Sequence, residues 1–561
     1  VYKRQVKRMN ERRRKRIEKN ILKNRKYKTL IYNRVILTVA LVLLQIVLYG
    51  LLVASFYTSG WTVLMAVDIL GLLFVLYVIN RNEKPSAKLN WVIMILVLPI
   101  CGISLYLLFG EGRPTRRMNK RITAAKRANA GILVQDAEMK ERVENGGRNA
   151  EICRYLMNYA NYPVYGDGEV TYYPSGKEMF KDMLAAVEKA ERFILAEYFI
   201  IAGGKMWDTF RELLLKKADE GVQIKLVFDD VGSLMLLPPK YDKHLEFVHP
   251  NIKCFKFNPA VPIFTMRMNN RDHRKILVVD GKVAFTGGIN LADEYIDEKI
   301  KYGKWKDTGV RVTGRAVNSF TMMFFNIWNA FRKDKGKLRD FIAPEYREEE
   351  YAAADGASET VGKNGTHIPV ESIGESPHGK GYFVQPYDDS PLDRESVGET
   401  VYLDLINRAS KYLYIFTPYL ILDDFMRTAL CNAAKRGVDV RLVLPGIPDK
   451  KLIFRLTRSY YVPLLRAGVR IYEFTPGFLH AKCYVSDDRA AVVGSINMDY
   501  RSLFLHFECG ALLLYNSQVI ALRDDVLRTL PECREVQLAD CRTSLAGTLL
   551  DSVLRLLSPL M

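Results

Sequence analysis

Hydrophobic residues follow three different patterns along the chain, and the first is a series of long runs that carry almost no charge. The runs are Val35 to Tyr57, Trp61 to Ile79 and Trp91 to Phe109, the last broken by Pro99 and Gly102. At 1.5 Å per residue, the first run is long enough to cross a hydrocarbon core of about 30 Å. A signal peptide would have a shorter apolar core, and no second run would follow it at once. We therefore predict a helical membrane region over residues 35–110.

The second pattern is a set of shorter segments that occur twice. A run rich in β-branched and aromatic residues at 191–201 is matched by one at 411–421, and residues 221–230 are matched by residues 437–446. Between the two members of each set lies a segment with helical periodicity that ends in Gly. Strand, helix, strand is typical of a parallel sheet. We predict an α/β fold of two tandem repeats, with mixed, largely parallel sheets flanked by helices and packed around one active site.

Composition between the patterned segments predicts the domain boundaries. Residues 345–381 are polar, rich in Gly and Ser and poor in apolar periodicity, which is typical of a flexible linker. The expected parts are a basic tail (1–34), the membrane region (35–110), a charged helical connector (111–150), a first half (151–343), the linker (344–381) and a second half (382–561).

The net charge of +19 at first suggests a nucleic-acid partner. However, residues 1–29 hold 14 Lys and Arg against two Glu, so most of the excess precedes the membrane region. No basic patch with interleaved aromatic residues marks the two halves, and we expect no nucleic-acid binding.

Basic flanks on both sides of the membrane region place both flanks in the cytoplasm, which needs an even number of crossings. We favour a hairpin of the first two runs, with the third re-entrant or along the interface.

Cysteine usage and the N-terminal residue add little to this picture. The eight Cys show no zinc-type spacing, and we expect reduced, mostly structural thiols. The chain begins with Val1, as expected of a trimmed chain or a fragment.

The third pattern is a His and a Lys two residues apart in a strand-like segment, followed by an Asp. It occurs as "HRKILVVD" from His273 and as "HAKCYVSD" from His480. Residues i and i+2 of a strand share a face, so His273 and Lys275 project together, as do His480 and Lys482. Asp280 and Asp487 fall on the opposite face, where support of a turn is the expected role. The other five His (244, 249, 367, 378 and 506) lack this setting, and we interpret them as surface or structural residues.

Acidic and amide residues recur downstream of both motifs. Asn290 and Asn497 end matching Gly-Gly/Ser-Ile-Asn segments, and the segments "WKDTG" and "HFECG" place Asp307 opposite Glu508. A carboxylate on the next strand could accept the His Nδ1–H and leave Nε2 free. The alternative is an ordinary exposed acid at a strand end, and recurrence favours the His-orienting role.

Two imidazoles, two ammonium groups and two amides suit a phosphodiester substrate. The Lys and Asn donors would stabilise charge on the non-bridging oxygens as phosphorus becomes five-coordinate. One His would attack phosphorus while the other protonates the leaving alkoxide and deprotonates the incoming alcohol. This chemistry needs no metal and no cofactor, and no acidic cluster of magnesium-site character accompanies the motifs.

At these residues the chain resembles the phospholipase D superfamily. With "TPYL" at 417–420, "GSINMDYRSLFLHFE" at 494–508 and the closing "LLSPLM", it resembles the bacterial cardiolipin synthases. The resemblance implies transfer of a phosphatidyl group from one phosphatidylglycerol to another through a phosphohistidine, giving cardiolipin and glycerol. It implies catalytic roles for His273, Lys275, Asp280, His480, Lys482 and Asp487, and phosphate contacts from Asn290, Asn497 and Ser495. His273 is the expected nucleophile and His480 the acid/base, in a multi-pass protein of a bacterial cell membrane with its halves on the cytoplasmic face.

Four points stay open. Gly288 stands where the superfamily pattern has Ser, so a hydroxyl contact is in doubt in the first half. Water or another alcohol, such as serine or ethanolamine, could replace the second phosphatidylglycerol, because pocket shape and dryness choose the acceptor. A nuclease is less favoured, and a non-enzymatic scaffold would have no reason to hold two complete motifs. The loop of residues 260–272 is either a lipid contact at the mouth of the site or a packed structural loop.

Overall fold

The computed structural model describes most of the two predicted halves. The described residues are 61–81, 85–107, 115–145, 150–260, 269–346, 382–393 and 395–558, with four isolated residues between 47 and 54. The basic tail, the first apolar run, residues 261–268 of the long loop and the linker from residue 347 to 381 therefore lie outside the described residues. So does the predicted hairpin of the first two runs.

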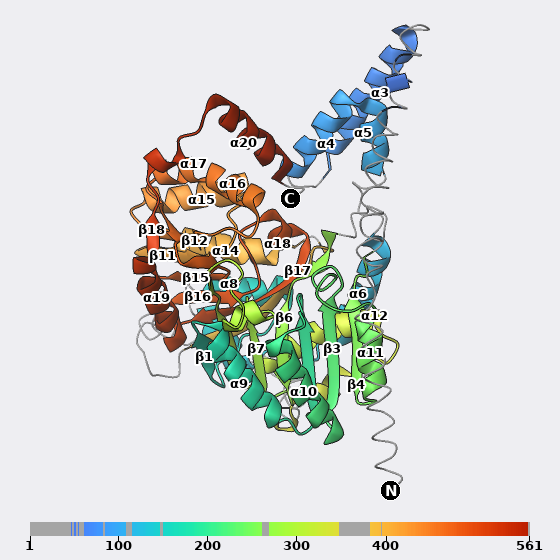
Figure 1. Ribbon diagram of the computed structural model, residues 1–561, viewed down its shortest axis with the longest axis vertical. Helices are drawn as coiled ribbons and strands as arrows, with labels where there is room; N and C mark the ends of the chain where they lie inside the picture. Colours follow the sequence, from blue (N-terminus) through green and yellow to red (C-terminus); the bar gives the residue numbers. More distant parts are fainter. Residues whose placement is uncertain are drawn as a thin grey trace, which may run out of the picture.

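Two sheets of matching strand order form the body of the molecule (Figure 1). Across the described residues, the first sheet has the order β1 (Val170–Tyr173), β9 (Gly309–Thr313), β7 (Val283–Gly287), β6 (Lys275–Val279), β2 (Phe193–Tyr198), β3 (Gln223–Asp229) and β4 (Ile252–Phe257). The second has β10 (Phe383–Asp389), β17 (His506–Leu514), β16 (Ala490–Gly494), β15 (Cys483–Ser486), β11 (Tyr412–Phe416), β12 (Asp439–Pro445), β13 (Arg470–Phe474) and β18 (Cys533–Glu535). Apart from β18, each strand has a counterpart at the same place, so the predicted internal repeat is confirmed.

Both sheets are mixed, as predicted, but the expectation that they are largely parallel is wrong. Only β2–β3–β4 and β11–β12–β13 pair in parallel among the main-sheet strands that the structure describes. The motif strands β6 and β15 are followed by turns of three residues, which can join only antiparallel neighbours, whereas a parallel pair needs a long crossover. The strand-helix-strand pattern therefore describes one side of each sheet.

Helices cover both sheets, and the sequence predicts two of them. Helices of the first half are α9 (Gly176–Glu188), α10 (Lys205–Asp219), α11 (Tyr241–Val248) and α12 (Val317–Phe331). Those of the second half are α14 (Val397–Arg408), α15 (Asp424–Lys435), α16 (Lys451–Ser459), α17 (Tyr461–Arg466), α18 (Tyr500–Phe504), α19 (Ser517–Thr529) and α20 (Leu545–Leu557). The crossover helices α10 and α15 confirm the two segments with helical periodicity. The Asp423 side chain caps α15 by accepting the Met426 N–H at 2.8 Å.

The two halves share one hydrophobic core. A single buried cluster contains Leu195 and Ile276 of the first sheet together with Phe383 and Ala511 of the second. Helix α12 is buried along Val317 to Trp328 and belongs to the same cluster. Because apolar burial contributes about 25 cal/mol per Å², separation of the halves would expose a surface that water disfavours strongly.

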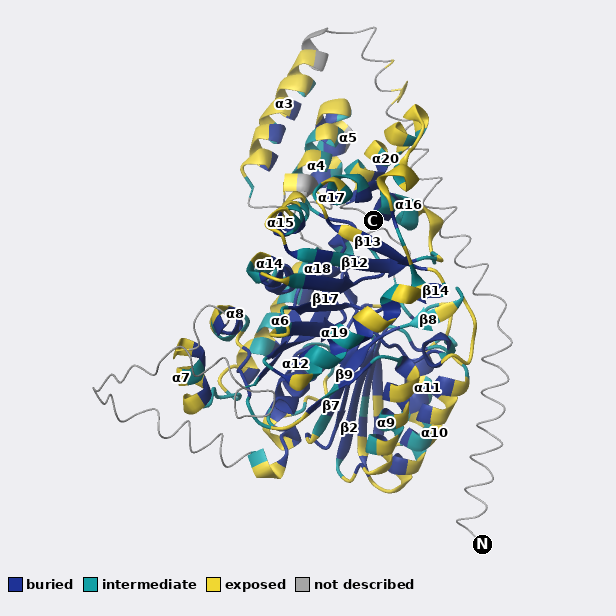
Figure 2. Ribbon diagram, turned by 90° about the vertical axis from the view of Figure 1, so that its left-hand side faces the viewer, coloured by how far each residue is buried: buried dark blue, intermediate teal, exposed yellow. Residues whose placement is uncertain are grey.

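The N-terminal helices are α3 (Trp61–Ile79), α4 (Pro85–Val97), α5 (Pro99–Leu105), α6 (Arg116–Asn129), α7 (Ala137–Asn145) and α8 (Glu151–Tyr155). The third apolar run is broken at Pro99, as predicted, but not at Gly102, which lies inside α5, and the connector is helical, as predicted. Among the described residues, no helix combines the length and apolar character needed to cross a membrane. Helix α3 is largely exposed in Figure 2.

Two short strand pairs join the halves next to the motifs. Strand β5 (Arg271–Asp272) pairs in parallel with β17 of the second half, and β14 (Gly477–Leu479) pairs in parallel with β8 (Lys304–Lys306) of the first. Each pair continues by one bond into the following His: His273 donates its N–H to Phe507 O at 2.9 Å, and His480 donates to Lys306 O at 2.7 Å. The main chain of each motif His is thus bonded to the other half.

Candidate active site

Each motif His is hydrogen-bonded to a carboxylate from the opposite half. His273 Nδ1 lies 2.9 and 3.0 Å from the two carboxylate oxygens of Glu508, and His480 Nδ1 lies 2.6 Å from Asp307 Oδ2. The exchange follows from the short strand pairs, because β5 lies beside the strand that carries Glu508 and β14 lies beside the strand that leads to Asp307. The predicted pairing of each imidazole with an acid is present, and its crossing between the halves is new.

Both motif Lys residues are buried beside the imidazoles. Lys275 and Lys482 each donate from Nζ to the carbonyl oxygen of the His two residues earlier. Burial lowers the pKa of Lys275 to about 8 and that of Lys482 to about 7. Burial is the main cause that lowers the pKa of His480, and the charges of Lys482 and Lys275 lower it further. Lys275 of the first half therefore lies close enough to His480 of the second half for their charges to interact, as expected if both motifs belong to one site.

Burial also sets the protonation states of the imidazoles and acids. It lowers the pKa of His273 to about 3, so this ring is neutral at pH 7. Burial alone would raise the pKa of Glu508, but the charge of His273, its hydrogen bond and the neighbouring His506 hold that pKa below the usual range. Burial raises the pKa of Asp307 to about 6 against the opposing charge of Lys482. Neutral imidazoles beside carboxylates fix Nδ1 as the protonated nitrogen and leave Nε2 with its lone pair.

The motif Asp residues, to which the resemblance gives a catalytic role, do not lie beside the imidazoles. Asp280 follows the far end of β6 from Lys275, at φ 55°, and accepts the backbone N–H groups of residues 191–193 at 2.8 Å. Asp487, at φ 56°, accepts those of residues 410–412. At about 3.3 Å per residue, five strand residues separate each carboxylate from its Lys by roughly 16 Å. Both residues hold the start of a neighbouring strand, the role that strand alternation predicts.

The residues expected to contact phosphate are differently engaged. Asn290 donates from Nδ2 to the Tyr295 hydroxyl and accepts the Ile200 N–H at Oδ1, so both ends of its amide are occupied. Asn497 is buried, and its Oδ1 has no hydrogen-bond partner among the described residues. Ser495 donates to Glu508 Oε2 and accepts the Cys509 N–H. The unpartnered Asn497 oxygen can accept a hydrogen bond but cannot bind a phosphate oxygen, and Ser495 supports Glu508.

The presence of Gly instead of Ser at position 288 has a steric cause. A Cβ at Gly288 would lie 2.0 Å from Asp307 Oδ1. The first half therefore places a carboxylate where the second half places the Ser495 hydroxyl. No serine side chain fits at position 288 unless Asp307 moves away from His480.

The surroundings of the two imidazoles differ. Three aromatic rings surround His480, with centroids at 5.4 Å for Trp305, 5.5 Å for Tyr295 and 5.8 Å for Phe478. His273 instead has Phe199 at 4.9 Å and His506 at 5.5 Å. The two half-sites are therefore chemically unequal.

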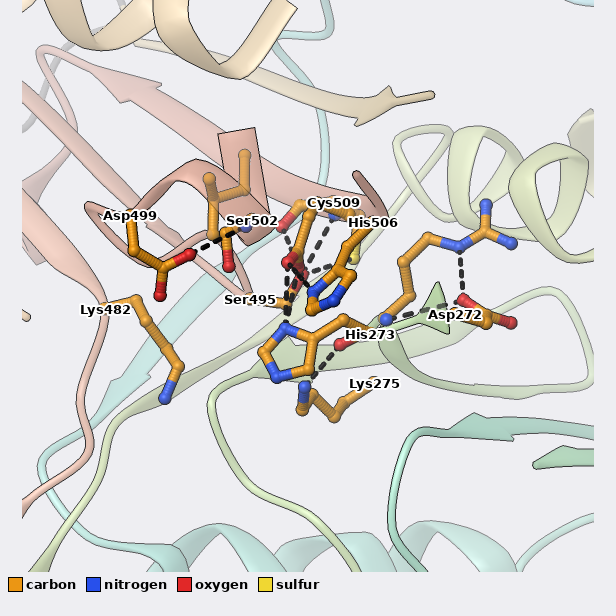
Figure 3. Close-up of polar contacts among 12 residues, drawn as sticks. Asp272, His273, Lys275, Lys482, Ser495, Asp499, Ser502, His506 and Cys509 are labelled. Atoms are coloured by element: carbon orange, nitrogen blue, oxygen red, sulfur yellow. Dashed lines mark hydrogen bonds and ion pairs between the residues drawn. The ribbon is translucent and has the colours of Figure 1, made fainter. Parts of the chain in front are cut away.

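His506 is not a surface residue, so that part of its interpretation is wrong, because its ring is buried in this cluster. In Figure 3 the His273 ring lies between His506 and the Lys275 side chain. A signal was present in the sequence: His506 stands two residues before Glu508, and hence on the same strand face, where the first half has Trp305 two residues before Asp307.

A buried ion network holds the strand between the motif residues. Arg274, which separates His273 from Lys275, contacts Glu197 at 2.5 Å, Asp272 at 3.2 Å and Asp388 at 3.6 Å. The arginine projects to the face opposite its neighbours and binds acids from both halves. It thereby fixes the segment that presents the imidazole.

The two halves of this chain are α/β repeats, and each contributes a His and a Lys to one shared site. This arrangement defines the phospholipase D superfamily. Residues 402–527 match the family model described as "Cardiolipin synthase, PLD-like domain", and residues 61–111 match the "Phospholipase D-nuclease N-terminal" model. A solved phosphatidylserine synthase from Haemophilus influenzae has the same fold, with a TM-score of 0.53 and 14% identity over 73% of this chain and all of that one.

Curated relatives refine this class. An uncharacterized protein of Streptococcus mutans is 40% identical over 87% of this chain and 99% of its own length. A cardiolipin synthase of Alkalihalophilus pseudofirmus is 30% identical over 91% of this chain and 98% of its own length. The chain belongs to the cardiolipin synthase family.

Proposed function

We propose that this protein is a cardiolipin synthase that transfers a phosphatidyl group from one phosphatidylglycerol to another and releases glycerol. The observation that supports this proposal best is the pair of crossed imidazole–carboxylate contacts, His273–Glu508 and His480–Asp307, in a single buried site. Two imidazoles that each keep a free Nε2 are what a two-step transfer through a covalent intermediate requires. The relatives named cardiolipin synthase supply the substrate class.

In the first step, His273 Nε2 attacks the phosphorus of one phosphatidylglycerol. The P–N bond forms, the bond from phosphorus to the glycerol oxygen breaks, and His480 in its protonated form gives its Nε2 proton to that oxygen. The substrate's negative phosphate favours this protonated form, because it offsets the charge of the two neighbouring lysines. Glu508 accepts the Nδ1–H of His273 throughout and stabilises the positive charge that develops on the ring.

In the second step, the terminal hydroxyl of another phosphatidylglycerol attacks the phosphorus. His480 takes the hydroxyl proton, the new P–O bond forms and the P–N bond to His273 breaks. Lys275 and Lys482, as ammonium groups, stabilise the non-bridging oxygens in both transition states. Asn497, by its likeness to Asn290 in the repeat, would donate from Nδ2 to the same phosphate. The cycle returns both imidazoles to their starting protonation states.

We also propose that the enzyme works on the cytoplasmic face of a bacterial cell membrane. The side chains exposed on α3 include Met65, Ile69, Leu72, Leu73 and Leu76, and those on α20 include Leu545, Leu549, Val553 and Leu557. The four α20 residues are spaced by four and so form one stripe, and α20 lies against α4 and α16. Protease sensitivity of the catalytic halves in inverted but not in right-side-out membrane vesicles would support this orientation.

The function is tested with the purified chain in phosphatidylglycerol vesicles that contain EDTA and free serine. Equal amounts of cardiolipin and glycerol are expected, with loss of both products in His273→Ala and His480→Ala and full activity in the matched control His249→Ala, which lies outside the site. Phosphatidic acid without cardiolipin would assign water as the acceptor, and phosphatidylserine would assign serine. Either result would refute the proposed acceptor.

A further inference from the structure

His506 is a buried ionisable side chain that the proposed reaction does not use. Only 9% of its surface is exposed, and neither ring nitrogen has a hydrogen-bond partner among the described residues. Its Nδ1 lies 3.6 Å from Glu508 Oε1, and its ring faces His273 (Figure 3). Buried polar atoms without partners cost free energy, so a ligand for these nitrogens would stabilise the site.

We propose that His273, His506 and Glu508 form an inhibitory binding site for a divalent transition-metal ion such as Zn²⁺. One ligand atom from each residue lies within 4.8 Å of the other two. Ligands at about 2.0–2.1 Å from a tetrahedral zinc ion lie roughly 3.4 Å apart, so a small closure of the side chains completes the site. Two imidazoles and one carboxylate leave a fourth position open for water, and imidazole favours zinc over magnesium.

Two of the three candidate ligands are already in contact, because His273 Nδ1 lies 2.9 Å from Glu508 Oε1. The ammonium of Lys275 interacts with both residues and repels a cation. We therefore expect affinity weaker than that of a structural zinc site.

Inhibition follows from the tautomer of His273. A neutral imidazole has one N–H and one nitrogen lone pair. When a metal ion takes the lone pair of Nδ1, the ring proton moves to Nε2, and the total number of protons does not change. An Nε2 that carries the proton has no lone pair to attack phosphorus. This consequence rests on the proposed function, whereas the binding of the ion does not.

The other half-site provides an internal comparison. Trp305 occupies the place of His506 there, beside His480 and Asp307. The indole nitrogen only donates hydrogen bonds and cannot bind a metal ion. One ion per chain is therefore expected at this pair of half-sites.

The test compares the full chain in detergent micelles with His506→Gln and with the matched control His249→Gln. Zn²⁺ affinity is measured by competition with a chromophoric chelator, and Co²⁺ spectra report the ligand type. We expect one site, tetrahedral Co²⁺ bands without thiolate charge transfer, and affinity at least tenfold weaker in His506→Gln alone. A second variant, His506→Asn, together with thermal unfolding, separates loss of the ligand from loss of the fold.

Activity measured over the same Zn²⁺ range decides the inhibitory part. Half-inhibition should coincide with half-saturation, EDTA should restore turnover, and the activity that remains in His506→Gln should be insensitive to Zn²⁺. Unchanged affinity in His506→Gln, or an equal loss in His249→Gln, would overturn the site. Binding without inhibition would overturn the tautomer argument. A chain that binds the ion through His506 but makes no cardiolipin would contradict the proposed function and leave the metal site standing.

Discussion

Replacement of Gly288 by Ala is expected to impair His480 without a direct change to any motif residue. The added Cβ would lie 2.0 Å from Asp307 Oδ1, whereas carbon and oxygen atoms in contact normally stay roughly 3.3 Å apart. The carboxylate must then shift by about 1.3 Å or turn, and we expect this to break the 2.6 Å contact that its other oxygen, Oδ2, makes with His480 Nδ1. Loss of a hydrogen bond to a charged group costs about 1.5–3 kcal/mol.

If that energy acts in the transition state, kcat/KM for cardiolipin formation falls by about 10- to 150-fold. The comparison variant is Ser495→Ala at the equivalent position of the second half, which removes the hydroxyl bond to Glu508 and the acceptor for the Cys509 N–H without any clash, and a loss of the same order is expected. Both variants are assayed with phosphatidylglycerol in mixed micelles, and thermal unfolding confirms that they fold. A Gly288→Ala enzyme with unchanged kcat/KM would refute the steric argument.

Three further predictions concern charge. Because the pKa of Lys482 is about 7, the free enzyme loses this ammonium as pH rises, so kcat/KM should fall above pH 7. Lys482→Arg stays charged and should move this basic limb of the pH profile upward by more than one pH unit. A limb that does not move would assign the fall to another group. Glu508 and His273 belong to different halves, yet Glu508→Gln should lower kcat by about 10³- to 10⁴-fold and prevent accumulation of the His273 adduct in rapid-quench experiments. An adduct formed at the normal rate would contradict the orienting role of Glu508. Arg274→Met leaves Glu197 buried without its cation and should lower the free energy of unfolding, measured with a denaturant, by about 3–5 kcal/mol. Adding Glu197→Gln should restore part of that stability. No recovery would argue against this ion pair as the cause.

Much of the architecture could be predicted from local pattern. The repeat, the helices α10 and α15, and the break at Pro99 follow from periodicity and from backbone limits that act over a few residues. The share of parallel pairing could not be predicted in this way, because strand-helix-strand patterns report only neighbours that a helix connects. The antiparallel side of each sheet is built by short turns and by strands distant in sequence.

The site was predictable in its residue types but not in its connections. Recurrence identified Asp307 and Glu508, yet the two halves carry nearly the same signals, so nothing local distinguishes a pairing within a half from one between halves. That choice depends on how the short strands β5 and β14 pack. His506 escaped notice because it has no counterpart His, and only its place on the strand face marks it.

The crossed contacts also bear on how activity arises during folding. His273 and Glu508 are 235 residues apart in sequence, and His480 and Asp307 are 173 apart. A half that folds first during synthesis therefore presents an imidazole with no carboxylate to set its tautomer, and a carboxylate with no imidazole. Under the proposed function, phosphate chemistry begins only when the second half docks, so a nascent chain would not attack the lipids around it, and turnover would report completion of the final folding step.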